Sequence, residues 1–264
     1  MKNNEKNILV LGASGEIGFA TYNHLLNAGF KCSGTSTNKN NSSDFINYNL
    51  FENINEKVNL KSYTHCIFCA AQTSVAKYEE NPEISKMINI DRTIDAMNKA
   101  IESGLRIIFL SSADVFAGKD PFYSINQKPN PLTNYGKSKL LIENHILNNY
   151  SNSCAIIRLT KVISNTTPFI EDWKNSAKEG KGIKAFCDKY ISPLDIYDLV
   201  KVIEIMITKD TFGLFQLGGK ENLTYLEFCK RYFANDKHLL QLIIPTYSNS
   251  ISPHASLATY LPKY

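Results

Sequence analysis

The sequence contains no apolar stretch that approaches the ~20 residues needed for a membrane-spanning helix. Residues 1–6 are polar, and the first apolar run covers only 8–11 before a glycine, so no secretory leader is indicated. Arginine is scarce, with four among 29 basic residues, and the lysines are scattered, which argues against the clustered basic surface of a nucleic-acid-binding protein. These absences predict a cytoplasmic protein that binds neither membranes nor nucleic acids.

Cysteine is also sparse, with six in the chain, and one pair alone has CxxC spacing. That pair, Cys66 and Cys69, lies in the apolar stretch 64–70, which is typical of a buried strand. Positions three apart on a strand point to opposite faces, so the two thiolates cannot easily share a metal. The sequence therefore predicts no metal site and buried structural cysteines.

Apolar strands and amphipathic helices alternate through the first 160 residues. The expected strands lie near 7–12, 31–36, 45–48, 64–70, 105–111 and 154–159, and the expected helices near 16–28, 83–103 and 134–149. Such alternation is typical of an α/β protein with a parallel sheet covered on both faces. From 161 to 264 the pattern loosens, leaving a helix at 195–207, a strand at 213–217 and a helix near 224–234. We expect this part to be too broken for a core of its own and to pack over the carboxyl edge of the sheet, with 190–217 returning to the sheet.

Three glycines follow the first expected strand in a GxxGxxG pattern, at positions 12, 15 and 18. The first suits a tight turn, the second lets a pyrophosphate approach the backbone, and the third lets a helix lie close to the sheet. The free N–H groups at the start of that helix attract an anion. The turn is therefore predicted to bind the phosphates of a dinucleotide through Gly12, Ser14, Gly15, Glu16, Ile17 and Gly18.

The end of the second expected strand bears on which dinucleotide is bound. An acidic residue there binds the ribose hydroxyls of NAD and repels the 2′-phosphate of NADP. Residues 34–39 contain no acid, and Ser36, Thr37 and Lys39 offer groups that can accept a phosphate. We therefore expect NADP(H) to be preferred over NAD(H). The margin should be modest because the segment has no arginine, so NAD stays an alternative.

A tyrosine and a lysine four residues apart, Tyr135 and Lys139, share one face of an expected helix. A lysine cation stabilises a phenolate and lowers the tyrosine pKa, so Tyr135 is a candidate proton donor to a carbonyl that receives hydride. Ser112, at the end of an upstream strand, is placed to hydrogen-bond the same carbonyl oxygen. A second Tyr-x-x-x-Lys match at 197–201 has no comparable Ser-Ser strand end upstream, so it is not assigned this role.

The helix at 134–149 carries two apolar stripes, although a surface helix normally shows one. Ile142 and Ile146 lie near the side of Tyr135, whereas Leu140 and Leu147 lie on another side. Two interpretations stay open. The helix is buried on two sides within one chain, or it contacts a second copy in a homodimer.

Together these residues resemble the extended short-chain dehydrogenase/reductase family over about 7–235. Besides the glycine turn, the likeness is carried by 70–72, 81–83, 88–89, 111–118, 130–139 and 192–199. Within the family, the run 70–75 and the segment 77–83 are similar to nucleotide-sugar ketoreductases of the dTDP-4-dehydrorhamnose reductase kind. The resemblance implies a Rossmann-type doubly wound parallel sheet, with an NAD(P)-binding domain over 1–160 and a small C-terminal substrate lobe within 161–264.

The resemblance also implies roles for individual residues. Ser112, Tyr135 and Lys139 would form the catalytic trio, and Asn89 would support it. Further cofactor contacts would come from Asn49, Leu50, Ala70, Ala71, Gln72 and Asn89, and from Tyr135 and Lys139 themselves.

The expected function is that of an NADP(H)-dependent oxidoreductase that reduces a keto group on a nucleotide-activated sugar. One alternative is a nucleotide-sugar 4-epimerase that holds NAD tightly. The missing acid at the second strand argues mildly against it. A second alternative is a dinucleotide-binding sensor or scaffold without catalysis. Such proteins typically lose the tyrosine or the lysine, and both are present here.

Overall fold

The computed structural model describes residues 5–37, 45–70, 82–118, 122–248 and 256–261. Its largest element is a seven-stranded parallel sheet with strand order β11-β6-β5-β4-β1-β2-β3. These strands are β1 (Asn7–Leu11), β2 (Lys31–Ser36), β3 (Phe45–Asn47), β4 (His65–Phe68), β5 (Arg106–Ser112), β6 (Cys154–Leu159) and β11 (Gly213–Leu217). The predicted fold class, a Rossmann-type doubly wound sheet, is confirmed.

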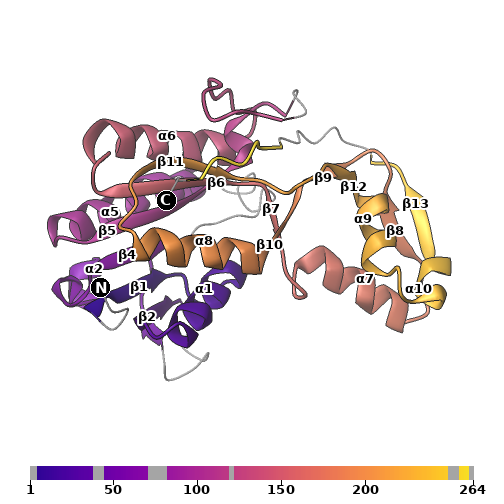
Figure 1. Cartoon of the computed structure of the whole chain (residues 1–264), viewed down its shortest axis with the longest axis horizontal. Helices are drawn as coiled ribbons and strands as arrows, with labels where there is room; N and C mark the ends of the chain where they lie inside the picture. The colour runs from indigo at the N-terminus through magenta and orange to yellow at the C-terminus, as the bar shows by residue number, and fades with distance from the viewer. Residues whose placement is uncertain (1–4, 38–44, 71–81, 119–121, 249–255, 262–264) are drawn as a thin grey trace.

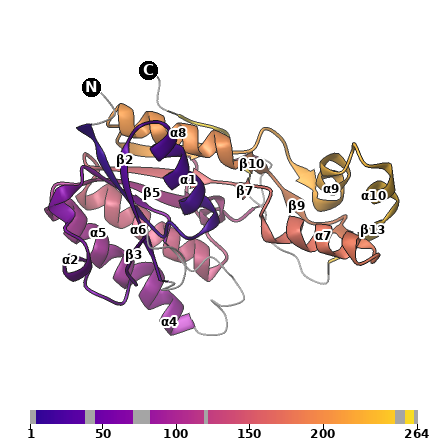
Figure 2. The same cartoon turned by 90° about the horizontal axis from the view of Figure 1, so that it is seen from below.

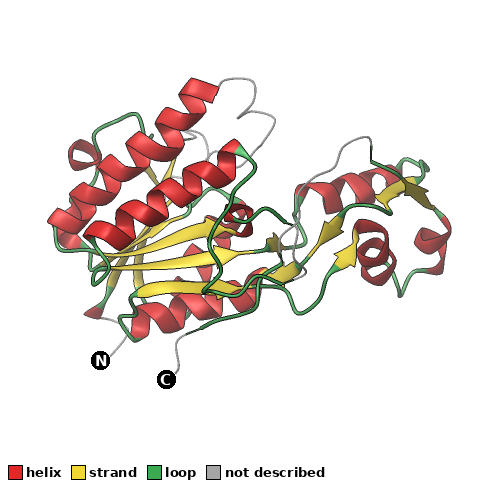
Figure 3. Cartoon of the chain, turned by 90° about the horizontal axis from the view of Figure 1, so that it is seen from above, coloured by secondary structure: helices red, strands yellow, loops and turns green. Residues whose placement is uncertain are grey.

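Helices cover both faces of this sheet (Figures 1 and 3). One face packs against α1 (Glu16–Asn27) and α8 (Ile196–Thr208). The other face packs against α2 (Ile54–Lys57), α5 (Thr93–Glu102) and α6 (Asn134–Asn149). Strand β1 shows why its sequence is apolar throughout, since Ile8 and Val10 contact one helical layer while Leu9 and Leu11 contact the other.

The stretch expected as one helix at 83–103 is divided in the structure. It begins as α4 (Pro82–Lys86), continues as the π-helix η3 (Met87–Arg92) and ends as α5. A π-helical turn widens the spiral and is frequent at functional sites. Here the widened turn carries the buried Asn89 toward α6. Two 3-10 turns flank this region of the chain. They are η2 (Leu60–Ser62), before β4, and η4 (Ala113–Val115), after β5.

A second lobe lies beyond the carboxyl ends of the sheet strands (Figures 1 and 2). Its elements are α7 (Pro168–Lys178), β8 (Ile183–Phe186), α9 (Tyr225–Tyr232), α10 (Lys237–Gln241) and β13 (Ile243–Thr246). Two short strand pairs join it to the sheet, namely β7 (Lys161–Ile163) with β10 (Pro193–Asp195) and β9 (Tyr190–Ile191) with β12 (Leu223–Thr224).

The expectation that this lobe lacks a core was wrong. Ile170, Trp173, Ile183, Cys229 and Phe233 are buried together in one apolar cluster. The sequence pattern hid this cluster because α7 and β8 are followed only much later in the chain by Cys229 of α9 and by Phe233 directly after that helix. Trp173 is 6% exposed and its Nε1 donates to the Lys184 carbonyl at 3.0 Å, so it serves this core.

None of the helices in the described ranges combines the length and apolar character needed to span a bilayer.

Candidate active site

The glycine turn leads from β1 into α1, and two of its glycines are required by the backbone itself. Gly12 has φ +82°, and a Cβ there would lie 2.7 Å from the Ala70 backbone nitrogen. A Cβ on Gly18 would lie 2.1 Å from the Gly12 carbonyl oxygen. Gly15 differs, since its nearest neighbour would be 3.5 Å away, and it faces open space at the start of α1. This position is therefore free for a ligand rather than filled by the protein.

A cavity of about 380 Å³ opens beside this turn, at the carboxyl ends of β1 and β2. Its walls include eight of the predicted cofactor residues: Gly12, Ser14, Gly15, Ser36, Thr37, Asn49, Leu50 and Ala70. No carboxylate belongs to the described part of this wall. Lys39, Ala71 and Gln72, which were also predicted to bind the cofactor, lie outside the described residues.

Two predicted cofactor residues of the turn, Glu16 and Ile17, do not line this cavity. The side chain of Ile17 packs against the core beneath α1 and also borders the neighbouring pocket. The Glu16 carboxylate accepts hydrogen bonds from the hydroxyls of Thr167, at 2.6 Å, and Ser164. Glu16 therefore ties the glycine turn to the segment that enters the second lobe.

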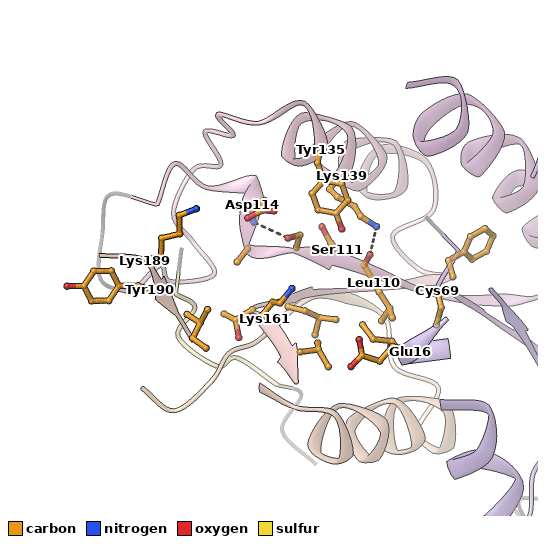
Figure 4. A pocket seen from close by; sticks show the side chains of 18 of the residues that line it. Glu16, Cys69, Leu110, Ser111, Asp114, Tyr135, Lys139, Lys161, Lys189 and Tyr190 are labelled. Carbon is orange, nitrogen blue, oxygen red and sulfur yellow. Dashed lines mark hydrogen bonds between the residues drawn. The ribbon is translucent and has the colours of Figure 1, made fainter. Parts of the chain in front are cut away.

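The predicted catalytic residues meet in a pocket of about 460 Å³ at the carboxyl edge of the sheet (Figure 4). Ser112 ends β5, and Tyr135 and Lys139 lie in the first turns of α6, which packs on one face of the sheet. Asn89 lines a small gap together with the same tyrosine and lysine. The two larger cavities share Cys69 in their walls, so the glycine turn and the Tyr135 side chain open onto adjoining spaces.

Lys139 is 6% exposed, and its surroundings hold it in one place. Its Nζ donates to the Leu110 carbonyl at 2.8 Å and lies over the rings of Phe109, at 4.6 Å, and Tyr135, at 5.7 Å. Burial lowers the pKa of Lys139 to about 8, against the attraction of Cys69 and Glu143, which acts to raise it.

The pKa of Tyr135 is raised in the structure, whereas the sequence predicted that it would be lowered. Burial raises it, and the nearby negative charge of Asp114 raises it further. The lysine cation was expected to lower this pKa. The phenol instead loses the water that would stabilise a phenolate, and it faces a carboxylate. Tyr135 is thus held in its protonated form.

Sequence analysis missed several residues of this pocket. Asp114 lies in η4, two residues after the predicted serine, and its backbone N–H donates to Ser112 Oγ at 3.1 Å. Burial raises the pKa of Asp114, whereas Lys161 lowers it. Lys189, Tyr190 and Tyr225 reach the pocket from the second-lobe side. No local motif marks them, because only the folding of β9 and α9 beside the sheet brings them close.

The cysteines of the CxxC pair have no metal-binding partners in the structure's described ranges, where no three His, Cys, Asp or Glu side chains are placed to hold a metal. Burial raises the pKa of Cys69 to about 12, and it raises that of Cys66 well above the ordinary value. Both thiols are therefore neutral and fill space in and beside the sheet.

The two apolar stripes of α6 have different surroundings. Ile142 and Ile146 are buried beneath the helix, and Leu140 packs against the cluster of Ala113 and Val115. Leu147 remains 38% exposed. Burial within one chain thus accounts for Leu140, and pairing with a second copy stays a prediction.

The sheet order, the glycine turn and the Tyr-x-x-x-Lys helix together define a protein of the extended short-chain dehydrogenase/reductase class. The chain belongs to the family described as the RmlD substrate binding domain, whose model matches residues 6–259.

The individual proteins that are similar to this chain carry names of two kinds, a subunit of methionine adenosyltransferase and dTDP-4-dehydrorhamnose reductases. Methionine adenosyltransferase 2 subunit beta of Danio rerio is 32% identical over 144 residues, which cover 54% of this chain and 44% of that relative. The match thus spans less than half the length of the relative. The structure of a dTDP-4-dehydrorhamnose reductase from Clostridium acetobutylicum superposes with a TM-score of 0.81 at 22% identity, covering 95% of this chain and 89% of that one. The structure of dTDP-4-dehydrorhamnose reductase from Bacillus anthracis in complex with NADP superposes with a TM-score of 0.80 at 19% identity, covering 95% and 88%.

Proposed function

We propose that this protein is an NADP(H)-dependent oxidoreductase that reduces a keto group on a nucleotide-activated sugar. The observation that carries the proposal is that Ser112, Tyr135 and Lys139 line one pocket, which adjoins the cavity beside the glycine turn. Hydride transfer with proton transfer needs a dinucleotide site and an acid at the same carbonyl.

The residues around the glycine turn fit a dinucleotide. The space in front of Gly15 and the N-terminal N–H groups of α1 suit a pyrophosphate, since a helix N-terminus attracts anions. The hydroxyls of Ser36 and Thr37 line the cavity at the end of β2 without a carboxylate in its described wall, which favours NADP over NAD. The similar Bacillus anthracis structure is a complex with NADP.

When bound, the reduced dinucleotide supplies a hydride to the carbonyl carbon. Tyr135 donates its phenolic proton to the carbonyl oxygen, and Ser112 donates a hydrogen bond to that oxygen and orients it. The Lys139 ammonium, fixed by the Leu110 carbonyl, stabilises the negative charge that develops on Tyr135 as its proton leaves. The raised pKa of Tyr135 keeps the proton in place until that moment.

The pocket wall also suits an anionic substrate with an aromatic base. Lys161 and Lys189 contribute two cations to the wall, and Tyr190 and Tyr225 also line it. Tyr190 is 52% exposed, and aromatic rings of this kind stack on nucleobases. A nucleoside diphosphate sugar offers the matching phosphates and base.

A second candidate function is that of a dinucleotide-binding subunit of another enzyme. It is favoured by the name of the Danio rerio relative, methionine adenosyltransferase 2 subunit beta. In that case the protein binds NADPH yet oxidises none with any keto-sugar nucleotide. The presence of both Tyr135 and Lys139 in one pocket favours the oxidoreductase.

Fluorescence titration with NADPH and with NADH tests the cofactor assignment, after the absorbance of the purified protein has been checked for bound nucleotide. We expect nucleotide-free protein that binds NADPH more tightly than NADH. Protein that is purified with NAD bound, or that prefers NADH, would contradict the assignment and favour the 4-epimerase.

A further inference from the structure

A fully buried ion pair lies directly behind the catalytic pocket. Glu143 of α6 is 0% exposed and Arg158 of β6 is 2% exposed. Arg158 donates to the Glu143 carboxylate through Nε, at 3.0 and 3.1 Å, and through Nη2, at 2.7 Å. The guanidinium also lies 5.0 Å from the centre of the Phe116 ring. Burying both charges is costly, and stability alone is a weak reason to keep such a pair.

The same pair fixes α6 against the end of β5. Glu143 follows Lys139 by one helical turn, so the two side chains lie on one face of the helix. Lys139 holds the Leu110 carbonyl at 2.8 Å, and Glu143 accepts from the Ser111 hydroxyl at 2.5 Å. Successive turns of α6 are thereby bonded to successive residues of β5, immediately before Ser112.

The network also reaches the outer strand of the sheet. Arg158 Nη1 donates to Gln216 Oε1 of β11 at 3.4 Å. Gln216 is 0% exposed, and its Nε2 donates to the carbonyls of Tyr123 and Ala258, at 3.0 and 3.1 Å. One buried chain of hydrogen bonds therefore runs from the catalytic helix across β6 and β11 to the C-terminal segment.

We propose that Glu143 and Arg158 are positioning residues for the reaction: Arg158 holds the Glu143 carboxylate, which sets the register of α6 on β5 and so places Tyr135 and Lys139 opposite Ser112. This inference rests on the proposed function. It adds two residues that touch neither substrate nor cofactor and act through Lys139 and Ser111.

The Ser111→Ala variant tests the link between helix and strand, because it removes one hydroxyl and leaves no unpaired cation. We expect kcat for NADPH-dependent reduction to fall on the order of 10-fold with an unchanged Kd for NADPH, since loss of register affects chemistry more than binding. The Tm should fall somewhat, because the buried Glu143 carboxylate loses a donor. The matched control is Ser103→Ala at the end of α5, whose hydroxyl bonds the Lys99 carbonyl at 2.8 Å, far from the pocket wall. A wild-type kcat for Ser111→Ala would overturn the proposal.

The double variant Glu143→Leu/Arg158→Met separates positioning from stability. It removes both charges and replaces them by apolar side chains, a change that buried ion pairs often tolerate in the fold. We expect a folded protein that binds NADPH and has kcat reduced about 100-fold, the size of loss that follows misplacement of reacting groups by an ångström. Wild-type kcat in a folded double variant would contradict the positioning role.

A readout independent of turnover is the NMR titration of Lys139 in protein with 13C-labelled lysine. The titratable groups around Lys139 are Cys69, directly after β4, and Tyr135 and Glu143 from its own helix, and the Phe109 ring covers it from β5. In Glu143→Gln, which keeps Arg158, the pKa of Lys139 should fall below about 8, because an attraction that raises it is lost. An unchanged Lys139 titration in Glu143→Gln would overturn the proposal. An inactive wild type would instead overturn the proposed function, and the titration would still decide the positioning role.

Discussion

The seven-stranded sheet and the second lobe were visible in the sequence to very different degrees. The sheet has apolar strands, a glycine turn and a Tyr-x-x-x-Lys helix, each with a local pattern. The lobe has a core of its own around Trp173, built from residues without a shared spacing. The glycine turn and the Tyr-x-x-x-Lys helix depend on local backbone geometry, so a short spacing in the sequence indicates them. The core of the second lobe depends on how distant elements pack together, and no such spacing indicates it.

Tyr135→Phe should have the largest effect on kcat, and it tests the catalytic residues at the edge of the seven-stranded sheet. The substitution removes the proton donor and keeps the ring, so kcat should fall by about 10²–10⁴-fold while the protein stays folded and binds NADPH. The matched control is Tyr197→Phe, at the second Tyr-x-x-x-Lys match, where the tyrosine is 68% exposed. Near wild-type turnover of Tyr135→Phe would refute general acid catalysis by this residue.

Trp173→Ala tests the lobe side. Truncating a buried tryptophan costs about 3–5 kcal/mol of unfolding free energy, and here it also removes the donor to the Lys184 carbonyl. We expect chemical denaturation to show a destabilised lobe while the Kd for NADPH stays unchanged. The control is Tyr247→Ala in the same lobe, where the side chain is 76% exposed. Loss of NADPH binding in folded Trp173→Ala protein would show that the two regions are not separable.

The pH dependence of kcat/KM tests the state of Lys139. Its pKa is lowered to about 8, so the ammonium is present below that pH and is lost above it. Because the charged form is the one that stabilises the phenolate, kcat/KM should fall about tenfold per pH unit above about pH 8. The raised pKa of Tyr135 keeps the phenol protonated throughout this range. A flat profile up to pH 10 would be incompatible with a required ammonium.

Gly15→Val and Gly18→Ala compare a glycine that faces the predicted ligand with one that packs against the backbone. Gly15 has φ −79° and room for a Cβ, so the variant should fold with an unchanged Tm. The branched side chain fills the space in front of α1, and the Kd for NADPH should rise at least about 10-fold. Gly18→Ala is the contrasting variant, since its Cβ would meet the Gly12 carbonyl and should lower the Tm. Unchanged NADPH affinity in Gly15→Val would place the pyrophosphate elsewhere.

Most of the sheet could be predicted from the sequence because strand and helix periodicity is local. The π-helical turn around Asn89 could not, since a single widened turn leaves the apolar spacing of the helix nearly intact. The raised pKa of Tyr135 was missed for a related reason. Spacing shows that Lys139 is one turn away, but it does not show that Asp114 and burial act on the phenol.

Lys189 and Tyr190 line the pocket, but no local sequence pattern predicts this. They lie more than fifty residues after Tyr135 in the chain, and they reach the pocket because β9 pairs with β12 beside the sheet. The buried Glu143–Arg158 pair was missed as well, because its partners come from α6 and β6 and become neighbours only in the folded sheet.

The most direct test of the proposed function is the oxidation of NADPH, followed by its absorbance, when purified protein is mixed with a nucleotide-linked 4-keto sugar. We predict stoichiometric NADPH consumption and a reduced sugar product with wild-type protein, and none when the keto sugar is omitted. Protein that binds NADPH but consumes none across a panel of nucleotide-linked keto sugars would contradict the oxidoreductase assignment and support a dinucleotide-binding subunit.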